Sequence, residues 1–375
     1  MYNEFIKQMK RGFLIMRKER GITLIALVIT IIVLLILVTV SIQAILGENG
    51  ISTKAKNAKV QSEIASEKEQ INVAYASCKI AKSDSEDDAV TADELEAEMN
   101  KSYGAGTVTV TGTERTITVK YGKTNRQYLI LQNGVIVDLD EILSNATYGV
   151  AIGLAEDGSL VDMSNWNYTF INLDEEYLDG EIWGYELGIQ NCGWTEGYKG
   201  EIVDGRIEGK VPAYILENSE EYGNDLEEGT FMPVISMAGT FRDETDLIYA
   251  PEIPSTVIRL GSTYYSGCFY GCSSLITVPT ISENVREMWC TFAYCSALEK
   301  APEIPKGVYN MAACFDGCFS LTGTLRVDAN PDNYNSMLEE AAINEGCDLV
   351  LTGSSTKLEE MLATKSEESN IRIGK

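Results

Sequence analysis

Nine cysteines and 56 acidic residues are the side chains of this chain best able to do chemistry, because it contains no histidine. That lack removes the commonest general base and the commonest metal ligand. Six cysteines form three close pairs, namely Cys268 and Cys272, Cys290 and Cys295, and Cys314 and Cys318. Three interpretations stay open: buried thiols acting as small hydrophobic side chains, disulfides between columns, or a zinc site. The spacing contains no CxxC pair, and the odd total excludes a fully paired disulfide framework.

Carboxylates are the second group of candidates. The acidic stretch Asp84–Asp88 could bind calcium, but it lacks the EF-hand pattern, and a solvated loop is favoured. Paired carboxylates could act as acid and base, but no pair stands out among so many acidic residues. Gly104–Gly106 is glycine-rich, but no helix that would cradle a phosphate follows it. Since no nucleophile elbow or metal cluster is found, the chain is predicted to be no enzyme and to need no cofactor or metal.

A repeat of 23 residues contains the cysteine pairs. Self-alignment places phenylalanine, cysteine and leucine at three fixed positions of each copy, which is typical of a solenoid. The nine predicted core residues are Phe269, Cys272, Leu275, Phe292, Cys295, Leu298, Phe315, Cys318 and Leu321. A degenerate copy begins at Phe241. A cysteine at one fixed repeat position predicts an internal column of buried thiols.

The segments Phe269–Leu275 and Phe315–Leu321 resemble the leucine-rich repeats of the BspA type. The resemblance implies a solenoid with a parallel sheet, and a binding surface, because such repeats occur in bacterial adhesins. Helical stretches at 336–344 and 357–364 predict that the last units use true helices. Thr356 and Glu359 have the spacing of a capping box at the second of these helices.

An uncharged run of 25 residues, Ile22–Leu46, lies near the N-terminus. As a helix it would span about 37 Å, and about 30 Å is enough to cross a bilayer core. Six basic residues precede the run and Glu48 follows it, so the positive-inside rule predicts a cytoplasmic leader and an external body. A secretory signal peptide is the main alternative, but its apolar core should be shorter.

The stretch Arg17–Ile25 resembles the class III signal of type IV prepilins. The resemblance covers about the first 80 residues. It implies that a prepilin peptidase cuts between Gly21 and Ile22 and that the new Ile22 amine is methylated. Either Met1 or Met16 can be the start of the leader. Ala26 departs from the family's glutamate at this position, which suits a minor subunit better than a major one.

Residues between the apolar run and the repeat predict a helix, a sheet and a second β-rich region. A charged helix with one apolar stripe follows the apolar run and resembles a pilin stalk. Alternating runs at 107–110, 116–119, 128–131 and 135–137 predict an antiparallel meander, the head of such a protein. The region 148–235 is rich in glycine and aromatic residues. Its aromatic residues predict either a small β core or an exposed patch that stacks on glycan, and they include Trp183, Tyr185, Trp194 and Tyr198.

Together these patterns predict an α+β fold: a long N-terminal transmembrane and stalk helix, a small antiparallel β-sheet head and a C-terminal leucine-rich-repeat solenoid. The predicted regions are the leader (1–21), the transmembrane and stalk helix (22–82), the head (83–147), the β-rich middle (148–235) and the solenoid (236–375).

The expected function is that of a pilin-like bacterial surface protein that displays a repeat module for adhesion or for contact with protein or glycan. The alternative is a structural minor, tip-like pilin subunit without a ligand of its own. Expected partners are the membrane, a prepilin peptidase, other pilin subunits and an unknown surface protein or glycan. The expected location is the cell membrane with an extracellular body. The net charge of −26 argues against nucleic acid as a partner.

Overall fold

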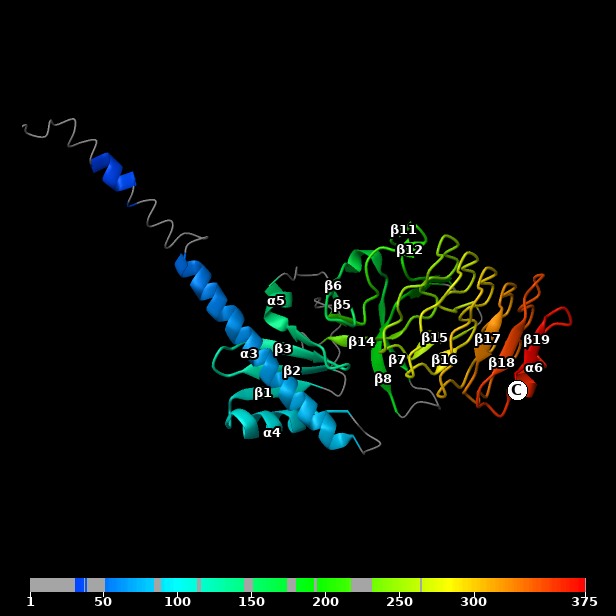
Figure 1. Ribbon diagram of the computed structural model, residues 1–375, viewed down its shortest axis with the longest axis horizontal. Coiled ribbons are helices and arrows are strands. Elements are labelled where there is room, and N and C mark those ends of the chain that lie inside the picture. Colours follow the sequence, from blue (N-terminus) through cyan, green and yellow to red (C-terminus); the bar gives the residue numbers. More distant parts are fainter. Residues whose placement is uncertain are drawn as a thin grey trace, which may run out of the picture. The chain divides into compact units, whose positions relative to one another are not determined.

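The structure is a computed structural model (Figure 1). It describes residues 31–36, 38, 51–83, 89–112, 116–144, 151–173, 180–191, 194–216, 231–263 and 265–374. The chain divides into two compact units, residues 1–70 and residues 71–375.

Helix α3 (Ile51–Lys82) is the long helix of the N-terminal part of the chain. Charged side chains such as Lys54, Lys59 and Glu67 recur along it, so it has no extended apolar stretch. No helix of the described residues is long and apolar enough to cross a membrane.

The predicted fold class, with its long N-terminal transmembrane and stalk helix, is therefore wrong. The bounds 22–82 of that region stay a prediction. The predicted location, an anchored protein in a bacterial membrane with an extracellular body, is wrong for the same reason. Most of the apolar run at 22–46 lies outside the described residues.

A four-stranded antiparallel sheet lies at the alternating runs of the sequence. Its strands are β1 (Val108–Gly112), β2 (Thr116–Tyr121), β3 (Gln127–Leu131) and β4 (Ile136–Asp138), in that order. Helix α4 (Ala92–Tyr103) precedes the sheet, and a capping box between Thr91 and Glu94 fixes the helix start. Helix α5 (Leu139–Ser144) follows it.

A mixed eight-stranded sheet connects the middle of the chain to the solenoid. In the middle region the strands are β5 (Ile152–Leu154), β6 (Leu160–Val161), β7 (Thr169–Leu173), β8 (Ile182–Glu186) and β13 (Tyr214–Leu216), with the 3-10 helix η2 (Met163–Asn165) after β6. Two small hairpins lie outside this sheet, formed by β9 (Ile189–Asn191) with β10 (Trp194–Glu196) and by β11 (Ile202–Val203) with β12 (Arg206–Ile207). The predicted boundary at residue 235 falls inside strand β14 (Met232–Ser236), which begins the parallel part of the sheet.

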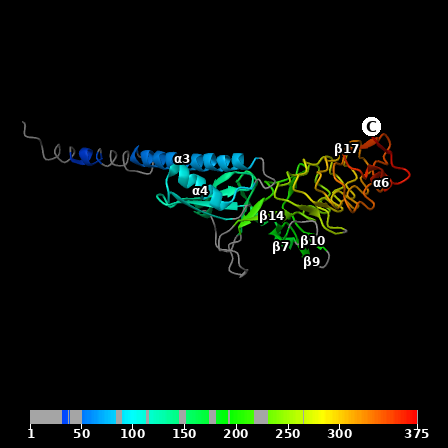
Figure 2. The same ribbon diagram turned by 90° about the horizontal axis from the view of Figure 1, so that it is seen from below.

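The C-terminal region is a β-solenoid in which two ladders of parallel pairing recur from turn to turn. In the first ladder β14 pairs with β15 (Arg259–Gly261), β15 pairs with β16 (Glu287–Met288), and single bridges continue to Asn310 and Asn333. The second ladder ends in β17 (Gly323–Arg326), β18 (Leu349–Thr352) and β19 (Ile371–Ile373). Figure 2 shows the successive turns running from β14 to the C-terminal end.

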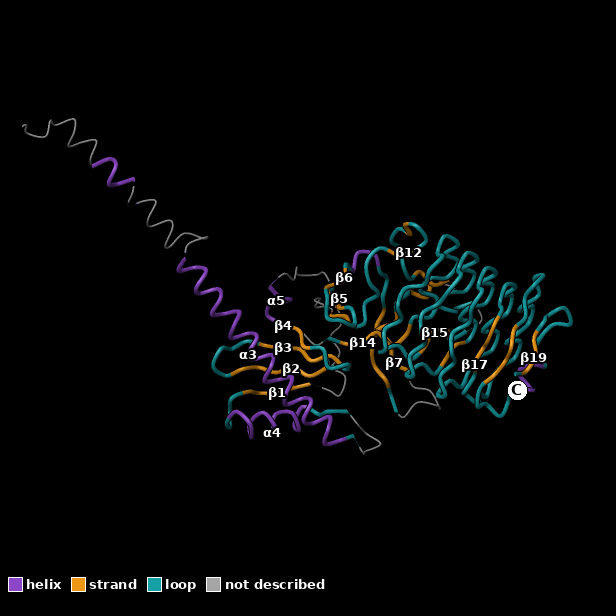
Figure 3. The backbone as a smooth tube through the Cα atoms, viewed as in Figure 1, coloured by secondary structure: helices purple, strands orange, loops and turns teal. Residues whose placement is uncertain are grey.

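Most strands of this solenoid are connected by turns rather than by helices (Figure 3). The predicted leucine-rich-repeat solenoid is therefore corrected to a β-solenoid. Residues 336–344, predicted to be helical, form turns. The one helix of the described C-terminal units is α6 (Leu358–Leu362). Its N-cap is Lys357, without a side-chain cap. The predicted cap residue Thr356 instead donates its hydroxyl to Asn330 Oδ1 at 3.0 Å.

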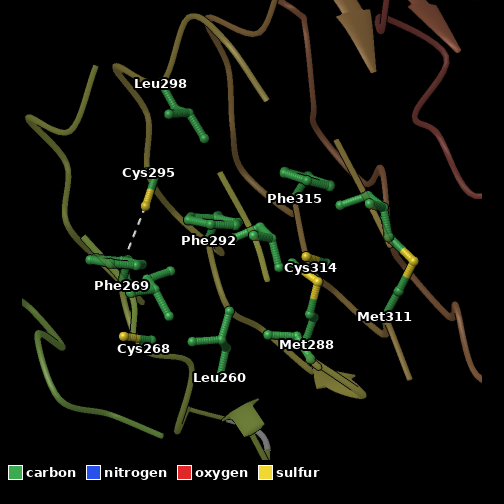
Figure 4. Packing of buried hydrophobic residues seen from close by; sticks show 14 of the residues in the cluster. Leu260, Cys268, Phe269, Met288, Phe292, Cys295, Leu298, Met311, Cys314 and Phe315 are labelled. Atoms are coloured by element: carbon green, nitrogen blue, oxygen red, sulfur yellow. Dashed lines mark hydrogen bonds between the residues drawn. The ribbon is translucent and has the colours of Figure 1, made fainter. Parts of the chain in front are cut away.

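The core of the solenoid consists of side chains stacked in columns (Figure 4). The rings of Phe241, Phe269, Phe292 and Phe315 stack nearly parallel, with centroids 5.5, 5.5 and 5.7 Å apart. Because each ring repeats at the same place in every turn, one turn shields the apolar face of the next.

Candidate functional site

One corner of the solenoid places a backbone residue in the left-handed region in five successive turns. These residues are Asp243 (φ 60°), Gly271 (φ 74°), Tyr294 (φ 61°), Gly317 (φ 68°) and Glu340 (φ 51°). The N–H of each of the first four donates to a carbonyl of the next turn, at 2.7 to 2.9 Å. The corner is therefore a continuous ladder of hydrogen bonds along the solenoid.

Large side chains and glycines alternate at this corner. A Cβ on Gly271 would overlap the Asp243 carboxylate, and a Cβ on Gly317 would overlap the Tyr294 ring. The two side chains thus lie across the glycine of the following turn. Glycine adopts this backbone conformation without strain, whereas in other residues it costs roughly 1–2 kcal/mol of conformational free energy. Asp243, Tyr294 and Glu340 adopt this left-handed conformation although they are not glycine.

Three tyrosines and one arginine form a row beside this corner, which we name the tyrosine ridge: Arg242, Tyr265, Tyr270 and Tyr294. Ring centroids lie 5.5 Å apart between Tyr265 and Tyr270, and 5.4 Å apart between Tyr270 and Tyr294, both edge to face. The Arg242 guanidinium lies 5.5 Å from the Tyr270 ring centroid, and its Nε is 3.1 Å from Asp243 Oδ2. The Tyr265 and Tyr294 side chains are 48% and 38% exposed.

A small hydrophobic cluster supports the ridge from below. Cys290, Ala293 and Ala313 are buried together, and Tyr270 and Trp289 pack against them. The cluster is separate from the phenylalanine core, so it lies on the outer side of these turns. Tyr270 is thus partly buried on small side chains, while the rings of Tyr265 and Tyr294 stay exposed.

Acidic residues border the ridge beyond Tyr294. Asp316 is 7% exposed and accepts a hydrogen bond from the Tyr294 side chain. Burial, together with the nearby Glu339, raises the pKa of Asp316 to about 6. Glu339 and Glu340 are exposed. The surface therefore combines aromatic ring faces with negative charge, which is the chemistry that attracts cations.

The nine repeat residues singled out from the sequence are all fully buried in the solenoid: Phe269, Cys272, Leu275, Phe292, Cys295, Leu298, Phe315, Cys318 and Leu321. They are packing residues and take no part in the ridge. Each thiol of the cysteine column donates to the phenylalanine carbonyl one turn earlier, from Cys272 to Phe241 (2.9 Å), from Cys295 to Phe269 (3.1 Å) and from Cys318 to Phe292 (3.0 Å).

The cysteines described in the structure are all free, and their described surroundings contain no group of residues that could hold a metal ion. Burial raises the thiol pKa of Cys268, Cys272, Cys314 and Cys318, so these thiols stay protonated. Cys290 does not lie in line with Cys268 and Cys314, because it belongs to the cluster beneath the ridge.

Several predicted features lie elsewhere. The processing residues Gly21 and Ile22, the departure Ala26 and the acidic stretch Asp84–Asp88 are outside the described residues. Of the aromatic residues that predicted either a small β core or a glycan-stacking patch, Tyr185 and Tyr198 are core residues, whereas Trp183 is 46% exposed and stacks on Phe170. The Trp194 side chain is outside the described set.

Comparison of the chain with protein-family models, with characterised proteins and with solved structures finds no match. The resemblances to a class III signal and to BspA-type repeats therefore stay predictions from the sequence. Any function has to be argued from the geometry of the chain itself.

Sequence reasoning missed the tyrosine ridge. Its signal is present, since Tyr270 and Tyr294 follow their repeat phenylalanines by one and two residues. Self-alignment on apolar core positions passes over outward-facing positions, because those vary from copy to copy. Comparing only the residues that follow each phenylalanine would have indicated the row.

Proposed function

We propose that this protein is a binding module whose solenoid holds a cationic segment of a protein partner along the tyrosine ridge. The observation that carries the proposal is the corner ladder. Tyr294 and Asp243 keep strained left-handed backbones at a position that glycine fills without strain in alternate turns. The strain is explained if their side chains serve recognition.

The chemistry of the ridge favours an arginine- or lysine-bearing partner. Edge-to-face tyrosines present ring faces that attract a guanidinium or ammonium group, and Arg242 already uses part of the Tyr270 face in this way. Asp243, Glu339 and Glu340 are exposed beside the rings and can pair with the same cations. The net charge of −26 would speed the approach of a basic partner.

This proposal keeps the protein-contact part of the function expected from the sequence. Cleavage between Gly21 and Ile22 by a prepilin peptidase stays a separate prediction, because both residues lie outside the described part. The alternative, a structural subunit without a ligand, predicts no specific binding by the ridge, so one experiment distinguishes the two.

The experiment measures fluorescence anisotropy of a labelled peptide of alternating glycine and arginine, titrated with the full chain at about 0.15 M salt. Tyr265→Gly and Tyr294→Gly are the test variants, because both tyrosines have positive φ (76° and 61°) and glycine suits that backbone. Each variant should weaken binding about fivefold, the effect of losing one exposed cation–π contact of about 1 kcal/mol.

Two variants serve as matched controls. Asn125→Gly introduces glycine at a left-handed residue (φ 59°) away from the ridge, and Tyr103→Ala removes a tyrosine that is 37% exposed. Both should bind the arginine peptide as the unaltered chain does. A peptide with glutamine in place of arginine should not bind. Equal affinity of the test variants and the controls, or no binding by the unaltered chain, would overturn the proposal.

A further inference from the structure

A cavity of about 620 Å³ lies between the first turn of the solenoid and three neighbouring segments of the same unit. Its lining comes from the β3–β4 turn, the β5–β6 turn, strand β12 with the residues after it, and residues 249–254 of the solenoid. The cavity is distinct from the tyrosine ridge, because the two share no residue. Its volume falls in the range of small-molecule sites, about 300–1,000 Å³.

The β11–β12 hairpin contributes Arg206 and Ile207 of strand β12 to the cavity lining. Figure 1 shows this hairpin beside the first turns of the solenoid. Asp204 and Gly205 both have positive φ (50° and 75°), as a tight two-residue hairpin turn requires. The Gly205 carbonyl accepts hydrogen bonds from the N–H groups of Ile248 and Tyr249, both at 3.0 Å. A Cβ at Gly205 would overlap the Ile248 side chain, so the hairpin tip sits directly on the solenoid.

This docking places Arg206 at the cavity. Its guanidinium lies over the Tyr249 ring, with Cζ 4.1 Å from the ring centroid. A guanidinium stacked on a ring keeps its five N–H donors at its edge, where they can form a fork. None of the ion pairs between described residues includes Arg206. The side chain is exposed.

Three of the other four charged residues that line the cavity, Lys210, Asp157 and Glu156, have partners within the protein, and the fourth, Glu252, is exposed. Lys210 forms an ion pair with Asp157 and donates to Ser159 Oγ at 3.1 Å. The Glu156 carboxylate accepts hydrogen bonds from the N–H and the hydroxyl of Ser255. Of the two cations that line the cavity, Lys210 is therefore held by a carboxylate of the protein, whereas the guanidinium of Arg206 is available to an external anion.

We propose that this cavity binds a small organic carboxylate, whose two oxygens accept the forked N–H donors of Arg206. A guanidinium and a carboxylate match in geometry, and such paired hydrogen bonds are among the stronger polar contacts in proteins. Glu252 and Asn133, which also line the cavity, offer acceptors and donors for hydroxyl or amide groups of the same ligand. Two sources present this chemistry: an acidic sugar and the free C-terminus of a peptide.

Isothermal titration calorimetry on the full chain tests the proposal with two matched pairs of probes. Galacturonate is compared with galactose, and acetyl-Ala-Ala is compared with its C-terminal amide. The carboxylate member of at least one pair should bind, and its neutral partner should bind at least about tenfold more weakly. The pair that shows the difference identifies the source of the carboxylate.

Variants at Arg206 complete the test. Arg206→Gln should reduce carboxylate binding at least about tenfold, and Arg206→Lys, which keeps the charge but loses the fork, should give an intermediate loss. Lys300→Gln, which removes an exposed cation outside the cavity, should bind normally. Thermal unfolding checks that each variant is folded. If neither carboxylate binds, or if Arg206→Gln binds as tightly as the unaltered chain, the proposal is wrong.

Discussion

Asp316 makes stability depend on pH at the scale of a single residue. Its folded-state pKa of about 6 lies above the ordinary value of 3.8, so the folded state holds the proton more tightly than the unfolded state does. The contribution of protonated Asp316 to the free energy of unfolding is therefore fully present below about pH 4 and is lost as pH rises through about 6. A shift of about two units corresponds to about 3 kcal/mol.

Asp316→Asn removes this titration. Compared with the unaltered chain, the variant should gain up to about 3 kcal/mol in unfolding free energy between pH 4 and pH 7.5, as measured by urea unfolding. Glu345→Gln, which replaces an exposed carboxylate nearby in the sequence, is the matched control variant. A difference between Asp316→Asn and the unaltered chain that is equal at both pH values would contradict the assignment.

Ionised Asp316 also adds negative charge beneath Tyr294, so affinity for the arginine peptide should rise over the same range.

The cysteine column predicts a clear pattern of thiol reactivity. Cys272, Cys295 and Cys318 are fully buried, and burial raises their thiol pKa values. Alkylation requires the thiolate. Iodoacetamide at pH 8 should therefore leave these three unmodified in the folded chain and modify them in urea, as read by peptide mass spectrometry. Cys347, which is partly exposed, serves as the internal reference. Rapid labelling of Cys295 in the folded chain would refute the buried column.

At the scale of elements, the sequence predicts core positions better than backbone shapes. The spacing of Phe269, Phe292 and Phe315 indicates a stacked column because one apolar position repeats in every turn, and the rings do stack. The connections could not be predicted in the same way. Non-glycine residues such as Tyr294 and Ala313 adopt left-handed backbones, held there by hydrogen bonds to the next turn. Tertiary contacts of this kind leave no local signal in the sequence.

The two candidate sites could not be predicted from the sequence for the same reason. Both the tyrosine ridge and the Arg206 cavity form where segments from different turns meet, and one sequence does not show which outward positions meet. The helix-capping signal in the sequence also gave a wrong prediction. The predicted capping pair Thr356 and Glu359 lies near the true helix, but Thr356 bonds to Asn330 of the preceding turn.

The β11–β12 hairpin gives a prediction at the scale of an element. Gly205→Ala adds a Cβ where the Ile248 side chain lies and strains a left-handed turn, so the hairpin should lift from the solenoid. Amide hydrogen exchange should then speed up at Ile248 and Tyr249, whose N–H groups donate to the Gly205 carbonyl. Gly209→Ala is the matched control, since Gly209 has a similar φ (84°) and open space around its Cβ position. Unchanged exchange at both amides in Gly205→Ala would show that the hairpin is not docked.

At the scale of the whole molecule, the corrected fold changes what holds the chain together. The predicted anchor and helical repeats would have placed much of the stability in helices. In the structure, the solenoid is held by two parallel ladders, the corner ladder and one stacked core. Most of these contacts join residues of neighbouring turns, more than 20 positions apart, so each turn of the solenoid is stabilised by the turns on either side of it.

The net charge of −26 acts on this whole assembly through self-repulsion. Raising ionic strength from about 0.01 M to about 0.15 M shortens the Debye length from about 30 Å to about 8 Å, which screens repulsion between acidic residues on successive turns. The thermal unfolding midpoint should therefore rise with salt, equally in NaCl and KCl, because screening does not depend on the identity of the ion. Binding of the arginine peptide should weaken over the same range, because there the screened interaction is attractive. A midpoint that falls with salt, or that differs between the two salts, would show that self-repulsion is not the dominant effect of the charge.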